Sequence, residues 1–118
     1  MPPRPSSPPD AFLPLPVAEF HILISLAEGP RHGYAIMREV EQQTGGEVRL
    51  GPGTLYTALR RMLDRGLVEE GSVDGPARRV GYRMAPLGRD VVVAEVARMQ
   101  ACVQMASASA LGRLLPGT

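Results

Sequence analysis

The sequence contains neither tryptophan nor lysine, and only five of its 118 residues are phenylalanine or tyrosine. A hydrophobic core must therefore be built from Leu, Val, Ile, Met and Ala, and the length suits one domain of about 100 residues. The single cysteine, Cys102, excludes an internal disulfide, and no apolar run of about 18 residues could span a bilayer. Because the first residues also lack the apolar stretch of a secretory signal, we expect a cytoplasmic protein.

Charge is nearly balanced over the whole chain. Thirteen arginines stand against 12 acidic residues, a net charge of +1, which does not by itself indicate a polyanionic partner. The distribution is uneven, however, because six arginines and four acidic residues lie between positions 31 and 66. Positive charge therefore collects in the middle of the chain.

Residues that could carry metal binding or catalysis are scattered. His21, His32 and Cys102 have none of the paired spacings of a zinc site, and His32 is predicted instead to cap a helix. Acidic pairs such as Glu69 and Glu70 are expected on exposed faces, whereas general acid-base catalysis needs desolvated carboxyls. There is no Walker-type phosphate loop, and neither Ser25 nor Ser72 stands in an arrangement with His and Asp that suggests a nucleophile. We expect no enzyme activity, no metal and no cofactor.

The hydrophobic pattern predicts a mainly α-helical fold with a small β-hairpin. Seven of the twelve prolines lie in residues 1–16, which we expect to form a disordered arm outside the fold. Residues 17–85 are predicted to form a winged helix-turn-helix, and residues 86–115 a long C-terminal helix. Within these, apolar periodicity and turn signals predict helices over 17–28, 33–44 and from Pro52 to about 63, and strands over 67–73 and 79–84.

The third predicted helix carries an exposed face suited to DNA. Its outward positions include Gly53, Thr54, Thr57, Arg60 and Arg61. Small residues at a helix start let the backbone approach phosphates, and arginine pairs with phosphate or reads guanine. In a winged helix this helix enters the major groove while the hairpin lies along the DNA backbone or minor groove.

The last predicted helix is apolar almost all round, and one stripe repeats at spacings of three and four. A helix so apolar in a small chain needs another surface to cover it, and a second copy of the chain is the simplest candidate. The stripe expected at a dimer interface consists of Val92, Val96, Met99, Val103, Ala106 and Ala110.

Three segments carry a family resemblance: LAEGPRHGYAIM at 26–37, GPGTLYTALRR at 51–61 and GLVE at 66–69. They resemble the PadR family of transcriptional regulators, and the single last helix is similar to the short subfamily, in which that helix makes the dimer. The resemblance implies a homodimeric repressor on a pseudo-palindromic operator of double-stranded DNA. The DNA contacts it implies, together with the exposed helix face, are Tyr34, Pro52, Gly53, Thr54, Tyr56, Thr57, Arg60, Arg61, Arg78 and Arg79. Where the family commonly has consecutive aromatics in the second wing strand, this chain has Val80-Gly81-Tyr82.

Two alternatives stay open at this stage. Tyr34 and Tyr56 could be core aromatics with their hydroxyls at the surface, and a winged helix could serve only as a protein-interaction module. Some members of the family bind phenolic acids or flat cationic drugs near the dimer interface, so a small hydrophobic or phenolic effector is a further hypothesis. Arg60→Ala and Arg79→Ala distinguish DNA binding from protein interaction, because a protein-interaction module should keep every activity unchanged in both variants.

Overall fold

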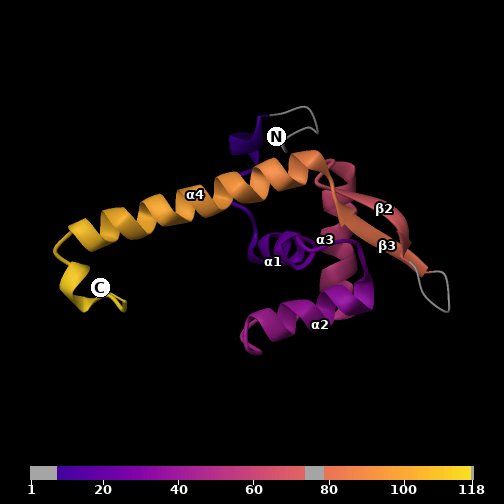
Figure 1. The fold of residues 1–118 in the computed structure, drawn as a ribbon, viewed down its shortest axis with the longest axis horizontal. Coiled ribbons are helices and arrows are strands. Elements are labelled where there is room, and N and C mark those ends of the chain that lie inside the picture. The colour runs from indigo at the N-terminus through magenta and orange to yellow at the C-terminus, as the bar shows by residue number, and fades with distance from the viewer. Residues whose placement is uncertain (1–7, 74–78, 118) are drawn as a thin grey trace.

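A computed structural model describes residues 8–73 and 79–117 and shows a winged helix with a long final helix (Figure 1). The predicted order of three helices, a hairpin and a last helix is confirmed. The elements in chain order are η1 (Pro9–Phe12), α1 (Val17–Ser25), β1 (Arg31–His32), α2 (Gly33–Gln43), α3 (Pro52–Asp64), β2 (Val68–Val73), β3 (Arg79–Met84), α4 (Pro86–Ala108) and η2 (Gly112–Leu114).

The core lies where α1 packs against α2, α3 and the beginning of α4. Each helix contributes the apolar side of its 3.6-residue pattern, which is why burial recurs every three or four residues. On α3 the same rule buries Leu55, Ala58, Leu59 and Met62 and leaves the opposite face in solvent. The largest fully buried apolar side chains are Ile22, Leu23, Ile36, Leu55, Leu59, Met62 and Leu67.

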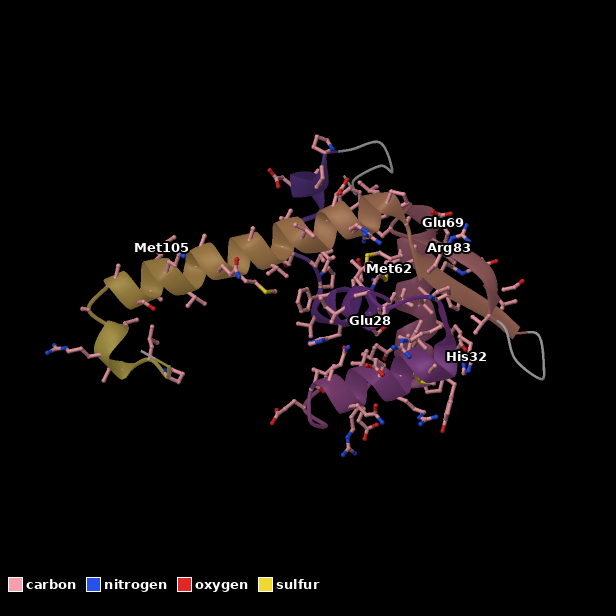
Figure 2. The ribbon with its side chains drawn as sticks, viewed as in Figure 1. Glu28, His32, Met62, Glu69, Arg83 and Met105 are labelled. Atoms are coloured by element: carbon pink, nitrogen blue, oxygen red, sulfur yellow. The ribbon has the colours of Figure 1, made fainter. Side chains whose placement is uncertain are left out.

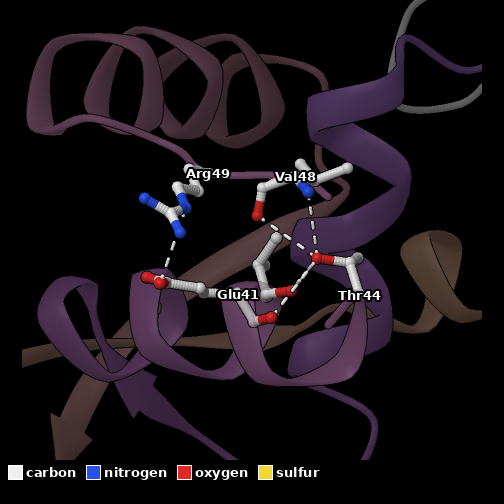
Figure 3. Close-up of polar contacts among 5 residues, drawn as sticks. Glu41, Thr44, Val48 and Arg49 are labelled. Carbon is white, nitrogen blue, oxygen red and sulfur yellow. Dashed lines mark hydrogen bonds and ion pairs between the residues drawn. The ribbon is translucent and has the colours of Figure 1, made fainter. Parts of the chain in front are cut away.

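The turn between α2 and α3 is built around Thr44 (Figure 3). Gly45 and Gly46 both have positive φ, of 60° and 85°, so the predicted left-handed glycine end of α2 is confirmed. The Thr44 hydroxyl donates to the Val40 carbonyl at 2.9 Å and accepts the Val48 amide N–H at 3.0 Å. These bonds fix the chain direction just before α3 begins.

The sheet has three strands in the order β1-β3-β2, one more than predicted. The additional strand is only two residues long, and it pairs His32 with Gly81 of β3. So short a strand has no periodic pattern that a sequence could show. Alternate residues of β3 share one face, yet their burial differs: Tyr82 is buried and Met84 half-buried, whereas Val80 is 64% exposed.

The N-terminal segment corrects a prediction. Residues 1–16 were expected to form a disordered arm, yet residues 8–16 are part of the fold, and the expectation for residues 1–7 lies outside the described residues. Phe12 and Leu15 are buried in the main core cluster together with Val91 and Val92 of α4. The backbone N–H of Leu15 also donates to the Glu95 carboxylate at 2.7 Å. The prolines therefore do not prevent packing: Pro9 begins the 3-10 helix η1, and the backbone is extended at Leu13 after it.

Two helices end earlier than predicted. The first stops at Ser25, whose hydroxyl bonds to the Ile22 carbonyl, and residues 26–29 form turns. The last stops at Ala108 and is followed by η2, where the prediction ran to residue 115. The outer half of α4 extends well beyond the winged-helix body (Figure 1). In the described part of the chain, no helix combines the length and apolar content needed to cross a bilayer.

Candidate nucleic-acid interface

The start of α3 presents bare backbone to solvent. Gly51 occupies the N-cap and makes no side-chain capping bond, and Pro52 follows at the first helical position. Gly53 and Thr54 are exposed, and nothing approaches within 4 Å of the place where a side chain on Gly53 would begin. Unbonded N–H groups and the positive end of the helix dipole therefore face outward, an arrangement that favours an anion such as a phosphate.

Two tyrosines near the start of α2 are surface residues, Tyr34 on α2 and Tyr56 on α3. Tyr34 is 57% exposed and Tyr56 is 49% exposed, so the core-aromatic alternative does not describe either ring. The ring of Tyr56 closely covers Gly33, where a Cβ would overlap the tyrosine hydroxyl. The Arg38 guanidinium lies 5.8 Å from the centre of the Tyr34 ring, within the range of a cation–π contact.

The start of α2 is capped by His32, as predicted. Its Nδ1 accepts the backbone N–H of Ala35 at 3.2 Å. Its ring also stacks on Tyr34, with 6.5 Å between the ring centres. Because β1 pairs with β3, His32 connects the tyrosine beside α3 with the second strand of the wing.

Arg60 points from α3 toward the wing. It lines a hollow of about 190 Å³ between α3 and the hairpin, together with residues of both elements. Burial raises the pKa of the Tyr82 hydroxyl in this hollow, Tyr56 and Glu70 raise it further, and the Arg60 charge lowers it. The residues that line the hollow are Tyr56, Leu59, Arg60, Leu63, Asp64, Glu70 and Tyr82.

Arg61 is arranged differently from its neighbour. Its side chain is 54% exposed, but Nε lies 3.7 Å from the carboxylate of Glu19 on α1. Arg65, one turn further along α3, approaches the same carboxylate at 3.6 Å. The two adjacent arginines therefore serve different sides of the helix, with Arg60 on the wing side and Arg61 on the α1 side.

The wing contributes a charged hairpin. Glu69 on β2 and Arg83 on β3 face each other across the strands and form an ion pair of 3.1 Å (Figure 2). Arg79 is the first residue of β3, whereas Arg78 lies outside the described residues. For the two arginines predicted to contact DNA from the wing, the structure therefore gives only the backbone position of Arg79.

The stripe predicted for dimer contact is divided by the structure. Val92 is only 6% exposed because it packs in the chain's own core, so its assignment to a second copy is wrong. Ala110 lies past the end of α4 and does not share a helical face with the others. Val96, Met99, Val103 and Ala106 keep exposed or half-exposed positions, and Met105 is 70% exposed on the outer half (Figure 2).

One residue of the site was missed from sequence. Glu19 was not singled out, although it lies three and four positions before Ile22 and Leu23 and so shares the buried face of α1. An acidic residue in phase with an apolar stripe is the signal that could have found it.

Three helices, a hairpin wing and an exposed third helix define a winged helix-turn-helix protein. The family described as "Transcriptional regulator PadR-like family" matches residues 22–94, more than half of the chain. The chain belongs to this family of transcriptional regulators, and the predicted resemblance is confirmed.

Curated relatives share the same region. The transcriptional regulator Rv3488 of Mycobacterium tuberculosis is 42% identical over 71 residues, which cover 58% of this chain and 63% of that protein. A 37.1 kDa protein of transposon TN4556 from Streptomyces fradiae is 39% identical over 82 residues, 70% of this chain and 23% of that protein. The matched region thus spans 23% to 63% of the length of these relatives.

Solved structures have the same fold. RosR of H. salinarum is 31% identical, with a TM-score of 0.59 and coverage of 86% of both chains. PadR of Bacillus subtilis, solved in complex with operator DNA, has a TM-score of 0.61 at 20% identity and covers 70% of this chain and 48% of its own. At that identity the likeness to PadR shows the fold alone.

Proposed function

We propose that this protein binds duplex operator DNA as a homodimer and represses transcription. The observation that carries the proposal is the exposed face of α3, on which Gly53, Thr54, Thr57 and Arg60 are exposed to solvent. Tyr56 on α3 and Tyr34 on α2 are exposed as well. One of the structural relatives, Bacillus subtilis PadR, is solved in complex with operator DNA. None of the other described elements of this chain covers that surface.

Each part of the surface has a distinct role in the proposal. The backbone at Pro52 and Gly53 approaches a phosphate, while Thr54, Thr57 and Arg60 face the major groove. Tyr34, Tyr56 and the arginines at 78 and 79 contact the DNA backbone beside the groove. Arg61 is left out of this set because its guanidinium is directed toward Glu19.

The dimer is proposed to form through the outer part of α4. Val96, Met99, Val103 and Ala106 give a second copy apolar contacts that this chain does not cover itself. Val91, Val92 and Glu95 belong to the chain's own core, so a truncation must leave them in place. A stop codon after Gln100 keeps this core and removes Val103 and Ala106 from the proposed dimer surface. We expect monomers by sedimentation and weaker DNA binding, since a dimer links two recognition helices about one DNA turn apart.

The test of DNA binding is fluorescence anisotropy with the duplex upstream of the protein's own gene, at two salt concentrations. Arg60→Ala should weaken binding by about 5- to 150-fold, the range of one lost base contact. Arg113→Ala removes the same charge in η2, at the far end of the molecule (Figure 1), and should leave affinity within about twofold.

The opposite result has a defined meaning. If wild-type protein binds neither this duplex nor an unrelated one at low salt, DNA binding is refuted and the protein-interaction module is favoured. The resemblance further implies release by a small hydrophobic or phenolic ligand, which the same assay tests by adding such ligands to the bound complex.

A further inference from the structure

Glu19 is a fully buried carboxylate without a hydrogen bond. Its side chain has 0% exposure, and neither oxygen accepts a hydrogen bond from any residue that the structure describes. The nearest charges are Arg61 Nε on α3 at 3.7 Å and Nη1 of Arg65, the C-cap of α3, at 3.6 Å. These distances make ion pairs but are too long for hydrogen bonds of normal strength.

This arrangement is unfavourable for stability alone. Burial raises the pKa of Glu19, and the charges of Arg65 and then Arg61 only partly oppose that effect. Apolar side chains of similar size often replace buried ion pairs without loss of stability. A role in placing the arginines therefore accounts for Glu19 better than a role in holding the core together.

Glu95 provides the contrast within the same chain. It is equally buried, yet it accepts the Leu15 N–H and a hydrogen bond from Arg98, and these bonds hold its pKa below the ordinary value. Its arginine partner lies on α4, on the same helix, and not on the helix proposed to enter the groove. The Glu95 carboxylate thus has hydrogen-bond donors in Leu15 and Arg98, whereas the Glu19 carboxylate has only ion pairs, one of them with Arg61 on α3.

We propose that Glu19 is a positioning residue that holds the Arg61 and Arg65 guanidiniums toward α1 and away from DNA phosphates. The inference rests on the proposed DNA binding and adds to it how the chain limits contacts that carry no sequence information. Arg60 is then the α3 arginine left for the groove. Contacts to phosphate contribute equally on every sequence, so withholding two cations lowers the affinity for DNA of unrelated sequence and reduces its salt dependence.

The test uses a 30-base-pair duplex of unrelated sequence, so it does not depend on knowing the operator. Glu19→Gln removes the charge with little change in shape. We expect the slope of log K against log salt to steepen by about 0.9 for each phosphate newly contacted. Arg61 should contribute first, because its side chain is 54% exposed against 21% for Arg65. The double variant Glu19→Gln with Arg61→Ala should return the slope toward the wild-type value.

A second arm works even if Glu19→Gln does not fold. Arg61→Ala in the wild-type background should leave the slope unchanged, because that guanidinium is held by Glu19. Glu95→Gln is the matched control, an equally buried glutamate on α4, and it should also leave the slope unchanged. Thermal melting and sedimentation of each variant show whether the fold and the dimer are intact.

The outcomes separate the two proposals. A wild-type protein that binds no duplex at low salt overturns the proposed function and this inference with it. Salt-sensitive wild-type binding with an unchanged slope in folded Glu19→Gln, or a slope reduced by about 0.9 in Arg61→Ala, overturns the inference alone.

Discussion

The N-terminal segment is expected to stabilise the fold through two side chains. Phe12 is 4% exposed and Leu15 is 7% exposed, and both pack on the first turns of α4. Leu15→Ala removes three carbons from this contact but keeps the backbone N–H that bonds to Glu95, so the variant isolates packing from hydrogen bonding. Replacing a buried leucine by alanine costs about 2–5 kcal/mol, and the lower end applies where a segment at the edge of the core can close the gap.

The assay is chemical denaturation followed by circular dichroism at fixed protein concentration, because a dimer makes stability depend on concentration. We expect a loss of about 2–3 kcal/mol for Leu15→Ala and a similar loss for Phe12→Ala. Val17→Ala is the control, since Val17 is adjacent in sequence but 65% exposed and should change stability by less than about 0.5 kcal/mol. If Leu15→Ala behaves like the control, the segment contributes nothing and the arm expected from proline content describes it better.

Two further predictions concern α4 and the buried glutamates. A Cβ on Gly88 would overlap the Leu67 carbonyl oxygen, a backbone atom that cannot rotate away. Gly88→Ala should therefore lower the free energy of unfolding by about 1–3 kcal/mol in the same assay. Unchanged stability would show that α4 can shift to make room for the methyl group. Glu95 has a pKa held below its ordinary value of 4.5, so its contribution to stability is present above pH 4.5 and lost as pH falls through its folded pKa. Glu19 has a raised pKa, so its contribution is present below pH 4.5 and lost as pH rises through its folded pKa. Glu95→Gln should therefore remove part of the loss of stability at acidic pH, and Glu19→Gln should remove part of the loss of stability as the pH rises. Equal dependence of the unfolding free energy on pH in the two variants would contradict these assignments.

Much of the fold follows from local patterns. Apolar residues at helical spacing place α1, α2 and α3, and the glycines after Thr44 set the end of α2, because these signals need only neighbours along the chain. His32 could be assigned as a cap for the same reason. The exposed face of α3 lies opposite its buried face, so the exposure of Gly53, Thr57 and Arg60 could also be predicted from the sequence.

Other features depend on contacts between distant residues. The two-residue strand at Arg31 exists only because β3 lies beside it, and the different directions of Arg60 and Arg61 depend on a carboxylate more than 40 positions earlier. The sequence favours Arg60 over Arg61 for the exposed face, because Thr57 and Arg60 lie three residues apart on the helix. The ion pair of Arg61 with Glu19 depends on the packing of α1 against α3.

The two errors about the ends of the chain have one cause. An apolar helix at the C-terminus was assigned wholly to a second copy because the proline-rich segment was assumed to lie outside the fold. Phe12 and Leu15 instead cover the first turns of α4, which places Val92 in the chain's own core. Because proline disfavours the interior of an α-helix, the segment lies along α4 as the short 3-10 helix η1 followed by extended backbone at Leu13. The surface available to the proposed second copy is consequently the outer part of α4, where Val103 is 63% exposed, and the truncation after Gln100 removes Val103 and Ala106 from it.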